Sequence, residues 1–449
     1  MSDNKKVKPQ NPKGTRDFLP QQVAKRNFIF STIKSVFRQY GFEEIETPAL
    51  ERLETLTGKY GDEGDKLLFK ILNSGDYLKS LPADIDGNSQ LATKYIAEKG
   101  LRYDLTVPLA RYAVQHQNDI VFPFRRFHIG PVWRADRPAK GRYQEFYQCD
   151  ADIIGSTSLI NEVELTKIYV DVFKKLGLDV TIKVNNRKVL DGIVNVAGCP
   201  QLLTEVTVAI DKFDKIGIDG VRRELGNAGL SDEQIASIEN LLEADTLDAI
   251  KAKFDGNETG LNGVAEMDYV FNLTDSANVK FDVKLARGLN YYTGTIWEVA
   301  ANGVDMGSIA SGGRYDNLTE MFGGQGMSGV GISFGIERIY DVMEELNLFP
   351  ENIAQGVKIL FVPRDASNEE YAFKLATIAR TEGISAEVFL GKAKKNKHFG
   401  YAATKGINYM VEVGDNEQQS RHFRLRNVAE HKEEGTGFSL EELMQHLKQ

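Results

Sequence analysis

Residues 124–155 read FRRFHIGPVWRADRPAKGRYQEFYQCDADIIG and hold five arginines. FHIGPVWRA is typical of a half-buried strand, with Phe127 and Trp133 as packing residues, and YQEFYQCDADII alternates apolar with polar residues as a second strand does. Pro138 and Gly141 mark a loop between them. Because a guanidinium group binds phosphate in a bidentate way, this pattern predicts a β-hairpin that grips a nucleotide. The alternative is that the arginines pair with surface carboxylates.

Composition indicates a soluble protein with more than one domain. The chain has 449 residues, of which 42% are hydrophobic and 27% charged, and this length predicts roughly two to four domains. No apolar run is long enough to cross a membrane and the N-terminus lacks a secretory pattern, so we expect a cytoplasmic protein without a membrane partner. Cys149 and Cys199 are too few and too isolated for a zinc site. We expect buried thiols and no protein-bound metal.

The formal net charge of −9 argues against a nucleic-acid partner, but its distribution weakens that argument. Residues 357–449 are close to neutral, so the acidic excess lies in the rest of the chain. Basic residues are grouped within this segment, which predicts local phosphate contacts, with a solvated lysine face as the alternative. They are Lys392, Lys394, Lys395, Lys397 and Lys405, followed by Arg421, Arg424 and Arg426.

Hydrophobic periodicity outlines the first 350 residues. It predicts an amphipathic helix over 21–40 that ends at Gly41, followed by a strand toward Pro48. The polar residues 73–100 suggest a surface excursion. Residues 185–260 have short helical patterns typical of a helical insertion, with Ser231 as a helix N-cap. Strand patterns resume at 279–285 and 292–300.

The last hundred residues follow a different rhythm. VKILFVPR, ISAEVFL and INYMVEVGD are strand-like, and helical patterns separate them. This alternation predicts a small parallel or mixed sheet covered on both faces, after a linker at 345–356.

One glycine motif is misleading. Gly324, Gly326 and Gly329 satisfy the GxGxxG pattern of dinucleotide-binding proteins. The pattern needs a strand before it and a helix after it, whereas this run leads into an apolar strand and then a helix that carries Arg338. We therefore discount an oxidoreductase.

Two further runs carry polar groups suited to a small ligand. LARGLNYYTGTIWE, residues 285–298, brings Arg287 close to two adjacent tyrosines, of which one is expected to line a pocket and the other to support it. Core tyrosines are the alternative. RYDLTVPLARY, residues 102–112, is predicted as a strand with Asp104 and Thr106 on one face, where they would hold an ammonium group.

The order of these motifs resembles that of histidyl-tRNA synthetases, which are class II aminoacyl-tRNA synthetases. Pro48, Arg134 and Arg338 match the three class II motifs, and RGLxYYTG is specific to the histidyl branch. The resemblance covers nearly the whole chain. It rests on KGTRDFLP at 13–20, the ETP before Ala49, the hairpin at 124–155, LARGLNYYTGT, SGGRYDNL at 311–318 and GVGISFGIERI at 329–339.

The resemblance implies an α+β fold. Residues 1–350 would form the class II catalytic domain, built on an antiparallel sheet, with a helical insertion at about 185–265. Residues 351–449 would form a C-terminal α/β anticodon-binding domain. A homodimer is also implied, because the motif around Pro48 packs at the dimer interface in class II enzymes.

The implied reaction is that of a histidine–tRNA ligase in protein biosynthesis. L-Histidine is activated by ATP to histidyl-adenylate and is then transferred to the tRNA for histidine, with AMP and pyrophosphate as products. Mg²⁺ would neutralise the pyrophosphate. Because negative charge builds on the α-phosphate, preorganised cations there would act on the transition state.

The resemblance also assigns residues. The catalytic arginines are Arg134 and Arg287, which would face the α-phosphate, and Arg338, which would take the γ-phosphate. Phe146 would stack on adenine, and Asp136 and Arg142 would complete the ATP site. Histidine binding falls to Asp104, Thr106 and Gln148 around the amino group, to Asp152, Tyr291 and Tyr292 around the imidazole, and to Arg287; the tRNA-binding candidates are Lys394, Lys395 and Lys397.

Some positions depart from the common family pattern, and two other functions compete. Asn290 stands where many members have Asp, and the motif 2 loop gives no clue to the tRNA bases that are read. A catalytically silent paralogue serves as a regulatory subunit of ATP phosphoribosyltransferase, but it usually lacks the C-terminal domain and the ATP arginines. A tRNA sensor would need kinase modules, whose signatures do not occur in this sequence.

Overall fold

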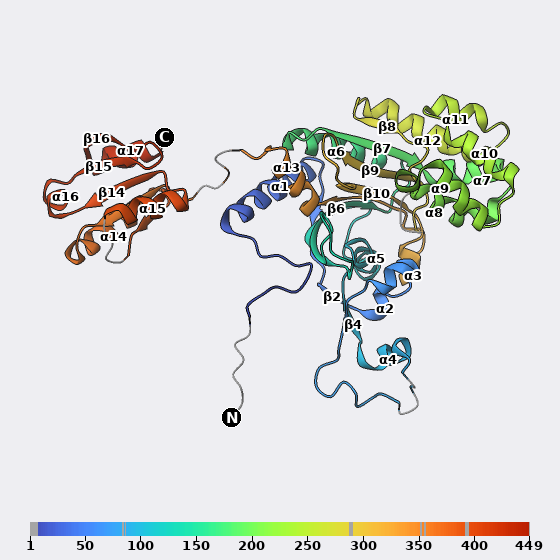
Figure 1. Cartoon of the computed structure of the whole chain (residues 1–449), viewed down its shortest axis with the longest axis horizontal. Helices are drawn as coiled ribbons and strands as arrows, with labels where there is room; N and C mark the ends of the chain where they lie inside the picture. The colour runs from blue at the N-terminus through green and yellow to red at the C-terminus, as the bar shows by residue number, and fades with distance from the viewer. Residues whose placement is uncertain are drawn as a thin grey trace. The chain divides into compact units, whose positions relative to one another are not determined.

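The chain divides into two compact units, Met1–Phe349 and Pro350–Gln449. Each has its own hydrophobic core, so each is described by itself. Figure 1 shows the elements of both units in the computed structural model. The structure describes residues 8–82, 85, 87–286, 291–350, 353, 356–390 and 395–448.

The described part of the first unit is built on a mainly antiparallel eight-stranded sheet. Only its two edge pairs, β1 with β5 and β7 with β8, are parallel. The α+β fold expected from the sequence is confirmed. The strand order is β1 (Glu43–Glu44), β5 (Phe124–Trp133), β6 (Glu145–Ile154), β11 (Gly329–Gly335), β10 (Ala310–Tyr315), β9 (Thr295–Ala301), β7 (Val180–Asn186) and β8 (Val279–Phe281).

The predicted arginine hairpin is formed by β5 and β6. Arg126 pairs with Asp152 and Gly130 pairs with Gln148 in an antiparallel register. Since successive side chains point to opposite faces of a sheet, Phe127 and the odd-numbered residues of β6 from Tyr147 to Ile153 enter the core, while the even-numbered residues of β6 face the other way. Phe127 is fully buried, as expected.

Three helices cover the core face of this sheet (Figure 1). They are α1 (Pro20–Gln39), α6 (Ile160–Leu176) and α13 (Ile336–Glu345). The helix predicted over 21–40 is confirmed; proline at its first position suits a helix start, and Gly41 follows it with φ +76°. Gly177 ends α6 in the left-handed conformation that favours glycine.

The helical insertion is present between β7 and β8 and has a separate hydrophobic cluster. Ser231 caps α10 as predicted: its hydroxyl accepts from the Gln234 amide, and the Gln234 side chain accepts from the Ser231 amide. Its helices are α7 (Arg187–Val196), the 3₁₀ turn η1 (Pro200–Leu202), α8 (Leu203–Asp211), α9 (Phe213–Asn227), α10 (Asp232–Leu242), α11 (Leu247–Lys253) and α12 (Glu258–Thr274).

A small three-stranded sheet accompanies the excursion at 73–100. The chain leaves it after β3 and returns through α4 to β4 (Figure 1). Its elements are β2 (Leu50–Arg52), α2 (Leu53–Leu56), α3 (Gly61–Lys66), β3 (Lys70–Ile71), α4 (Ser89–Ile96) and β4 (Lys99–Leu101).

One predicted strand is shorter than expected, and another is wrong. The strand expected toward Pro48 is only two residues long, as β1. Residues 102–112 form a turn and then α5 (Thr106–Gln115), because the Asp104 carboxylate accepts from the Val107 amide at 3.1 Å and so satisfies the start of a helix.

The second unit contains the predicted mixed sheet, in which β12 lies parallel to both β13 and β14. Alternate residues of β12 enter two hydrophobic clusters, one with α14 and α17 and the other with α15, so both faces are covered as expected. The sheet order is β13 (Ala386–Val388), β12 (Ile359–Pro363), β14 (Tyr409–Val413), β15 (His422–Asn427) and β16 (Lys432–Ser439), and the helices are η3 (Ala366–Asn368), α14 (Glu369–Thr381), α15 (Lys395–Lys405), α16 (Asp415–Ser420) and α17 (Leu440–Lys448).

Candidate active site

A cavity of about 460 Å³ lies on the sheet of the first unit. Its lining includes every residue of the catalytic, ATP-binding and histidine-binding candidates that the structure describes. Arg287 falls outside the described residues. The candidates brought together are Asp104, Thr106, Arg134, Asp136, Arg142, Phe146, Gln148, Asp152, Tyr291, Tyr292 and Arg338.

Strand β6 supplies one row of this lining. Phe146, Gln148 and Asp152 reach the cavity from alternate positions, as the period of a strand requires. Gln148 is fixed by its side-chain amide, which donates to the Ser333 hydroxyl at 2.8 Å. On β11, Gly331 lies opposite Asp152, and a Cβ there would approach the Asp152 carboxylate to 1.8 Å. Glycine at 331 therefore makes room for this carboxylate.

Asp152 is held by two buried partners that the sequence did not single out. The Tyr315 hydroxyl donates to one carboxylate oxygen at 2.5 Å, and Arg126 lies 2.7 Å from the other. Burial raises the pKa of Asp152, and the Arg126 charge and the Tyr315 hydrogen bond oppose that rise. Arg126 could have been found from its β5 register opposite Asp152, and Tyr315 from the SGGRYDNL motif.

Asp150 is a further acidic residue of this cavity, and sequence reasoning missed it. It is buried between Gln148 and Asp152 on the same strand face. Burial raises its pKa strongly, and the neighbouring Asp152 charge adds to that rise. The sequence could have indicated it, because Asp150 lies at the alternate strand position between Gln148 and Asp152.

Asp104 keeps one carboxylate oxygen available. Its Oδ1 accepts from the Val107 amide and from the Tyr60 hydroxyl, both at 3.1 Å. Its Oδ2 is buried and has no hydrogen-bond partner among the described residues. Burial raises the pKa of Asp104. Because an unpaired buried acceptor is costly, this oxygen is suited to a cationic ligand.

Tyr291 and Tyr292 both line the cavity, whereas we expected one to be a support. Their rings lie 5.0 Å apart at 73°. The Tyr292 ring occupies the space above Gly313, where a Cβ would approach it to 2.6 Å. Burial raises the pKa of Tyr292, followed by the charges of Asp152 and Asp104. Its hydroxyl therefore remains protonated at neutral pH.

Two arginines of the lining, Arg134 and Arg338, are oriented by main-chain oxygens. The Arg134 guanidinium lies 4.2 Å from the centre of the Tyr103 ring and 5.1 Å from that of Phe146, and its Nε donates to the Tyr103 carbonyl at 3.1 Å. Arg338 donates to the carbonyls of Gly141 and Ser308 at 2.8 and 2.6 Å. Arg142 lies 3.8 Å from Asp136. The cavity thus combines fixed cations, an aromatic face and buried carboxylates.

The basic segments of the second unit are only partly free of acidic partners. Lys394 lies outside the described residues, Lys395 begins α15, and Lys397 is exposed on the same helix. Lys405 pairs with Glu387 at 2.7 Å. Arg426 lies 3.1 Å from Glu433. Lys405 and Arg426 are therefore engaged in ion pairs within the unit, which neither the predicted phosphate contacts nor the alternative of a solvated lysine face anticipated.

No described helix is long and apolar enough to cross a bilayer. Likewise, within the described ranges, no group of three or more His, Cys, Asp and Glu residues is placed to hold a metal ion. Cys149 and Cys199 are free buried thiols, as predicted.

Known proteins resemble the chain over nearly its full length. The family model for histidyl-tRNA synthetase matches residues 14–339, and the anticodon binding domain model matches 357–449. Histidine–tRNA ligases of Bacteroides fragilis strain YCH46 and Christiangramia forsetii are 50% and 51% identical, each over 94% of this chain and 95% of the relative. The histidyl-tRNA synthetase structure from Nostoc sp. PCC 7120 has a TM-score of 0.82 at 28% identity and covers 99% of both chains. The chain belongs to the histidyl-tRNA synthetase family.

Proposed function

We propose that the cavity of the first unit is the site at which this chain joins L-histidine to ATP. The chain carries out the ligase reaction of its family, in which histidine is activated with ATP and transferred to its tRNA. The observation that supports this location is that eleven predicted side chains, from four stretches of the sequence, line one cavity.

Histidine is proposed to bind among the carboxylates. The unpaired Oδ2 of Asp104 is suited to the α-ammonium group, with Thr106 and Gln148 beside it. An imidazole ring has one N–H donor and one acceptor, which require complementary partners. Asp152 supplies an acceptor that Arg126 and Tyr315 keep in one orientation, and the protonated hydroxyl of Tyr292 supplies a donor.

ATP is proposed to bind along the arginines. Phe146 offers a ring for adenine, and Asp136 and Arg142 complete the nucleotide site. Arg134 is held by the Tyr103 carbonyl and would face the α-phosphate, where charge builds as pyrophosphate leaves, with Arg287 assigned to the same phosphate by family resemblance. Arg338 would take the γ-phosphate. A cation already in position needs no reorganisation when the charge develops.

The nucleotide substrate is proposed to be ATP with Mg²⁺ on its phosphates. Mg²⁺ in such sites is held mainly by the phosphates and by one or two carboxylates. The lining includes the Asp136 carboxylate beside the ATP candidate Arg142, which is a ligand of the kind this mode uses. The ion would neutralise the leaving pyrophosphate.

The second unit is proposed to bind the anticodon region of the tRNA, with Lys394, Lys395 and Lys397 as phosphate contacts. A homodimer is proposed from the class II motif at Pro48, which is exposed next to Leu50, whose side chain is 48% exposed. We also propose that the protein acts in the cytoplasm, where translation takes place.

Histidine-dependent exchange between ATP and pyrophosphate tests the site directly. Arg134→Ala should lower the exchange rate about 100-fold or more, because one preorganised charge at a developing anion is lost. Arg125→Ala is the matched control, since Arg125 lies on the same hairpin but pairs with Glu164 at 2.7 Å. Normal exchange in folded Arg134→Ala would refute the assigned role, and exchange without histidine would refute the substrate.

The same assay distinguishes the ligase from the alternative function, a regulatory subunit of ATP phosphoribosyltransferase. A regulatory paralogue would bind histidine without catalysing exchange. The presence of Arg134, Arg338 and a matched anticodon binding domain favours the ligase.

A further inference from the structure

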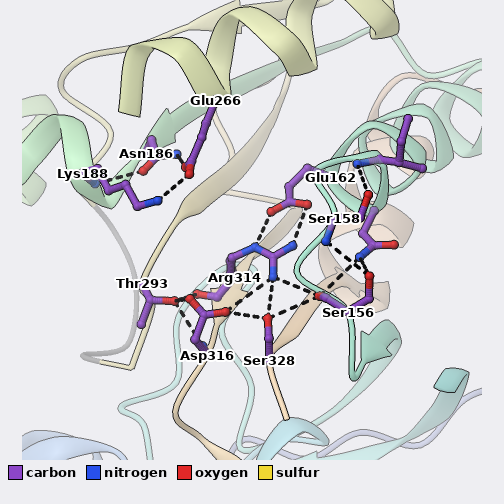
Figure 2. Close-up of polar contacts among 12 residues, drawn as sticks. Ser156, Ser158, Glu162, Asn186, Lys188, Glu266, Thr293, Arg314, Asp316 and Ser328 are labelled. Carbon is purple, nitrogen blue, oxygen red and sulfur yellow. Dashed lines mark hydrogen bonds and ion pairs between the residues drawn. The ribbon is translucent and has the colours of Figure 1, made fainter. Parts of the chain in front are cut away.

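A partly buried polar cluster lies next to the tyrosine pair in the sequence and the fold, and the function proposed above does not use it. It joins the loop after β6, the first turn of α6, and strands β10 and β11 to the residue that follows Tyr292 (Figure 2). Its members are Ser156, Glu162, Thr293, Arg314, Asp316 and Ser328, and we call it the Arg314 cluster.

Arg314 and Glu162 form the centre of the cluster. Two guanidinium nitrogens of Arg314 lie 2.5 and 2.8 Å from the two carboxylate oxygens of Glu162. Glu162 is fully buried and Arg314 is 7% exposed. This pair ties β10 to the start of α6 across 152 positions of sequence.

Asp316 carries the connection toward the cavity. Its Oδ1 accepts from the Ser328 hydroxyl at 2.6 Å and lies 3.5 Å from Arg314, and its Oδ2 accepts from the Thr293 hydroxyl at 2.6 Å. Burial alone raises the pKa of Asp316, but the hydrogen bonds from Ser328 and Thr293 and the Arg314 charge leave that pKa below its usual value. Asp316 is therefore an ionised acceptor at neutral pH.

Thr293 is fixed at three points. Its amide donates to the Arg314 carbonyl at 2.8 Å, its hydroxyl donates to Asp316, and the Asp316 amide is 3.1 Å from the same hydroxyl. Thr293 directly follows Tyr291 and Tyr292, both of which line the cavity. Any shift of Thr293 would therefore move the tyrosines.

Strand β10 contacts the cavity residues on one face and Glu162 on the other. Gly313 leaves room for the Tyr292 ring, and Tyr315 donates to Asp152, whereas Arg314 between them points to Glu162. This follows from the alternation of side chains along a strand. The same short strand thus places both imidazole candidates, Asp152 through Tyr315 and Tyr292 through Gly313 and Thr293.

The energetics favour a geometric role. A buried ion pair returns little net stability, because desolvation of the two charges offsets their attraction. In addition, the single positive charge of Arg314 faces two negative charges, those of Glu162 and Asp316, so the cluster is not electrically neutral. The hydrogen bonds of the cluster have fixed directions, and three of them hold Thr293 beside the tyrosines.

We propose that Arg314, through Glu162 and Asp316, is a positioning residue that sets histidine affinity by fixing Thr293 and hence Tyr291 and Tyr292. The inference rests on the proposed placement of histidine beside these tyrosines. It assigns Arg314 no contact with histidine or ATP.

Two isosteric substitutions two residues apart provide the test. Thr293→Val removes the hydroxyl that bonds Asp316. Thr295→Val is the matched control, because the Thr295 hydroxyl is buried and has no hydrogen-bond partner among the described residues. Thr293→Ser keeps the hydroxyl and is the rescue variant.

The measurements are the KM values for histidine and for ATP in pyrophosphate exchange, with thermal unfolding as a check of the fold. Thr293→Val should raise the histidine KM about tenfold, as expected for a lost hydrogen bond to a charged group, and change the ATP KM less than about twofold. Thr293→Ser and Thr295→Val should both stay within about twofold of the wild type for both substrates. Arg314→Lys, which loses the bidentate contact, should raise the histidine KM in the same direction.

An unchanged histidine KM in folded Thr293→Val would overturn the inference, and so would an equal rise in Thr295→Val or an equal rise in the ATP KM. If Arg314→Lys does not fold, the two threonine positions still decide the outcome. Wild-type protein without histidine-dependent exchange would instead overturn the proposed function, and the inference with it.

Discussion

At the scale of single residues, Asp152 shows how burial turns an ordinary carboxylate into a directional acceptor. Arg126 and Tyr315 occupy its two oxygens at 2.7 and 2.5 Å, and Gly331 opposite leaves space for it. A residue with this many fixed partners selects a ligand by geometry as well as by charge.

This arrangement predicts a separation between histidine and ATP. Asp152→Asn and Tyr292→Phe should each raise the histidine KM about tenfold or more while the ATP KM stays nearly constant, because a buried hydrogen bond to the imidazole is lost. Asn is chosen over Ala at position 152 because it keeps a partner beside the buried Arg126. Pyrophosphate exchange measures both constants. Histidine KM values equal to that of the wild type in both variants would place the imidazole elsewhere.

His128 predicts a pH dependence of stability. Burial, followed by the charges of Arg126 and Arg102, lowers the pKa of His128 from 6.5 to about 3. Its folded-state pKa lies below the unfolded value, so the unfolded chain binds the extra proton first. The contribution of neutral His128 to the free energy of unfolding is therefore fully present above pH 6.5. It decreases as the pH falls from 6.5 toward 3, by up to about 1.4 kcal/mol per pH unit.

Urea unfolding at pH 8, 6.5 and 5 checks this prediction. His128→Gln cannot take up that proton, so its free energy of unfolding should fall less between pH 6.5 and 5 than that of the wild type. Parallel curves for the two proteins would contradict the lowered pKa.

At the scale of elements, the glycines of β10 and β11 decide whether neighbouring strands can carry large polar side chains. Gly331→Ala would bring a Cβ to 1.8 Å from the Asp152 Oδ1 in the middle of the sheet. Overpacking of this kind costs about 1–3 kcal/mol, and histidine-dependent exchange should fall with it because Asp152 must move.

Gly226→Ala is the control for this element-scale prediction. Gly226 lies in α9, and the nearest atom to its Cβ position is 4.0 Å away. The substitution should leave exchange unchanged and stabilise the protein by less than about 1 kcal/mol, since Gly is a weaker helix former than Ala and position 226 lies in the last turn of α9. Thermal unfolding and exchange assays compare the two variants. A Gly331→Ala protein with wild-type exchange would show that Asp152 does not need its present position.

At the scale of the whole molecule, the two units have independent cores. The last residues of the first unit, Leu346, Leu348 and Phe349, pack against the core of that unit. The clusters of the second unit contain only residues from 357 onward. A chain that ends at Pro350 therefore keeps its own buried contacts.

We expect such a shortened chain to retain histidine-dependent pyrophosphate exchange and to charge tRNA much more slowly than the full chain. The proposed adenylate site lies within the first unit, while tRNA affinity would lose the proposed phosphate contacts of the second. Replacing Lys394, Lys395 and Lys397 with Ala in the full chain should weaken tRNA binding and flatten its salt dependence. Lys374→Ala, at a surface lysine that pairs with Glu370, is the control. An unchanged salt slope in the triple variant would remove these lysines from the RNA site.

The sequence by itself determined the hairpin, the helical insertion with its Ser231 cap, the mixed C-terminal sheet and the family. Periodicity and capping are local features that can be recognised within one segment, and the order of the motifs can be followed along the sequence without knowledge of the fold. Only the tertiary structure revealed the partners of Asp152 and the contact between Arg314 and Glu162, because these depend on strand register and on elements that meet across more than a hundred positions of sequence.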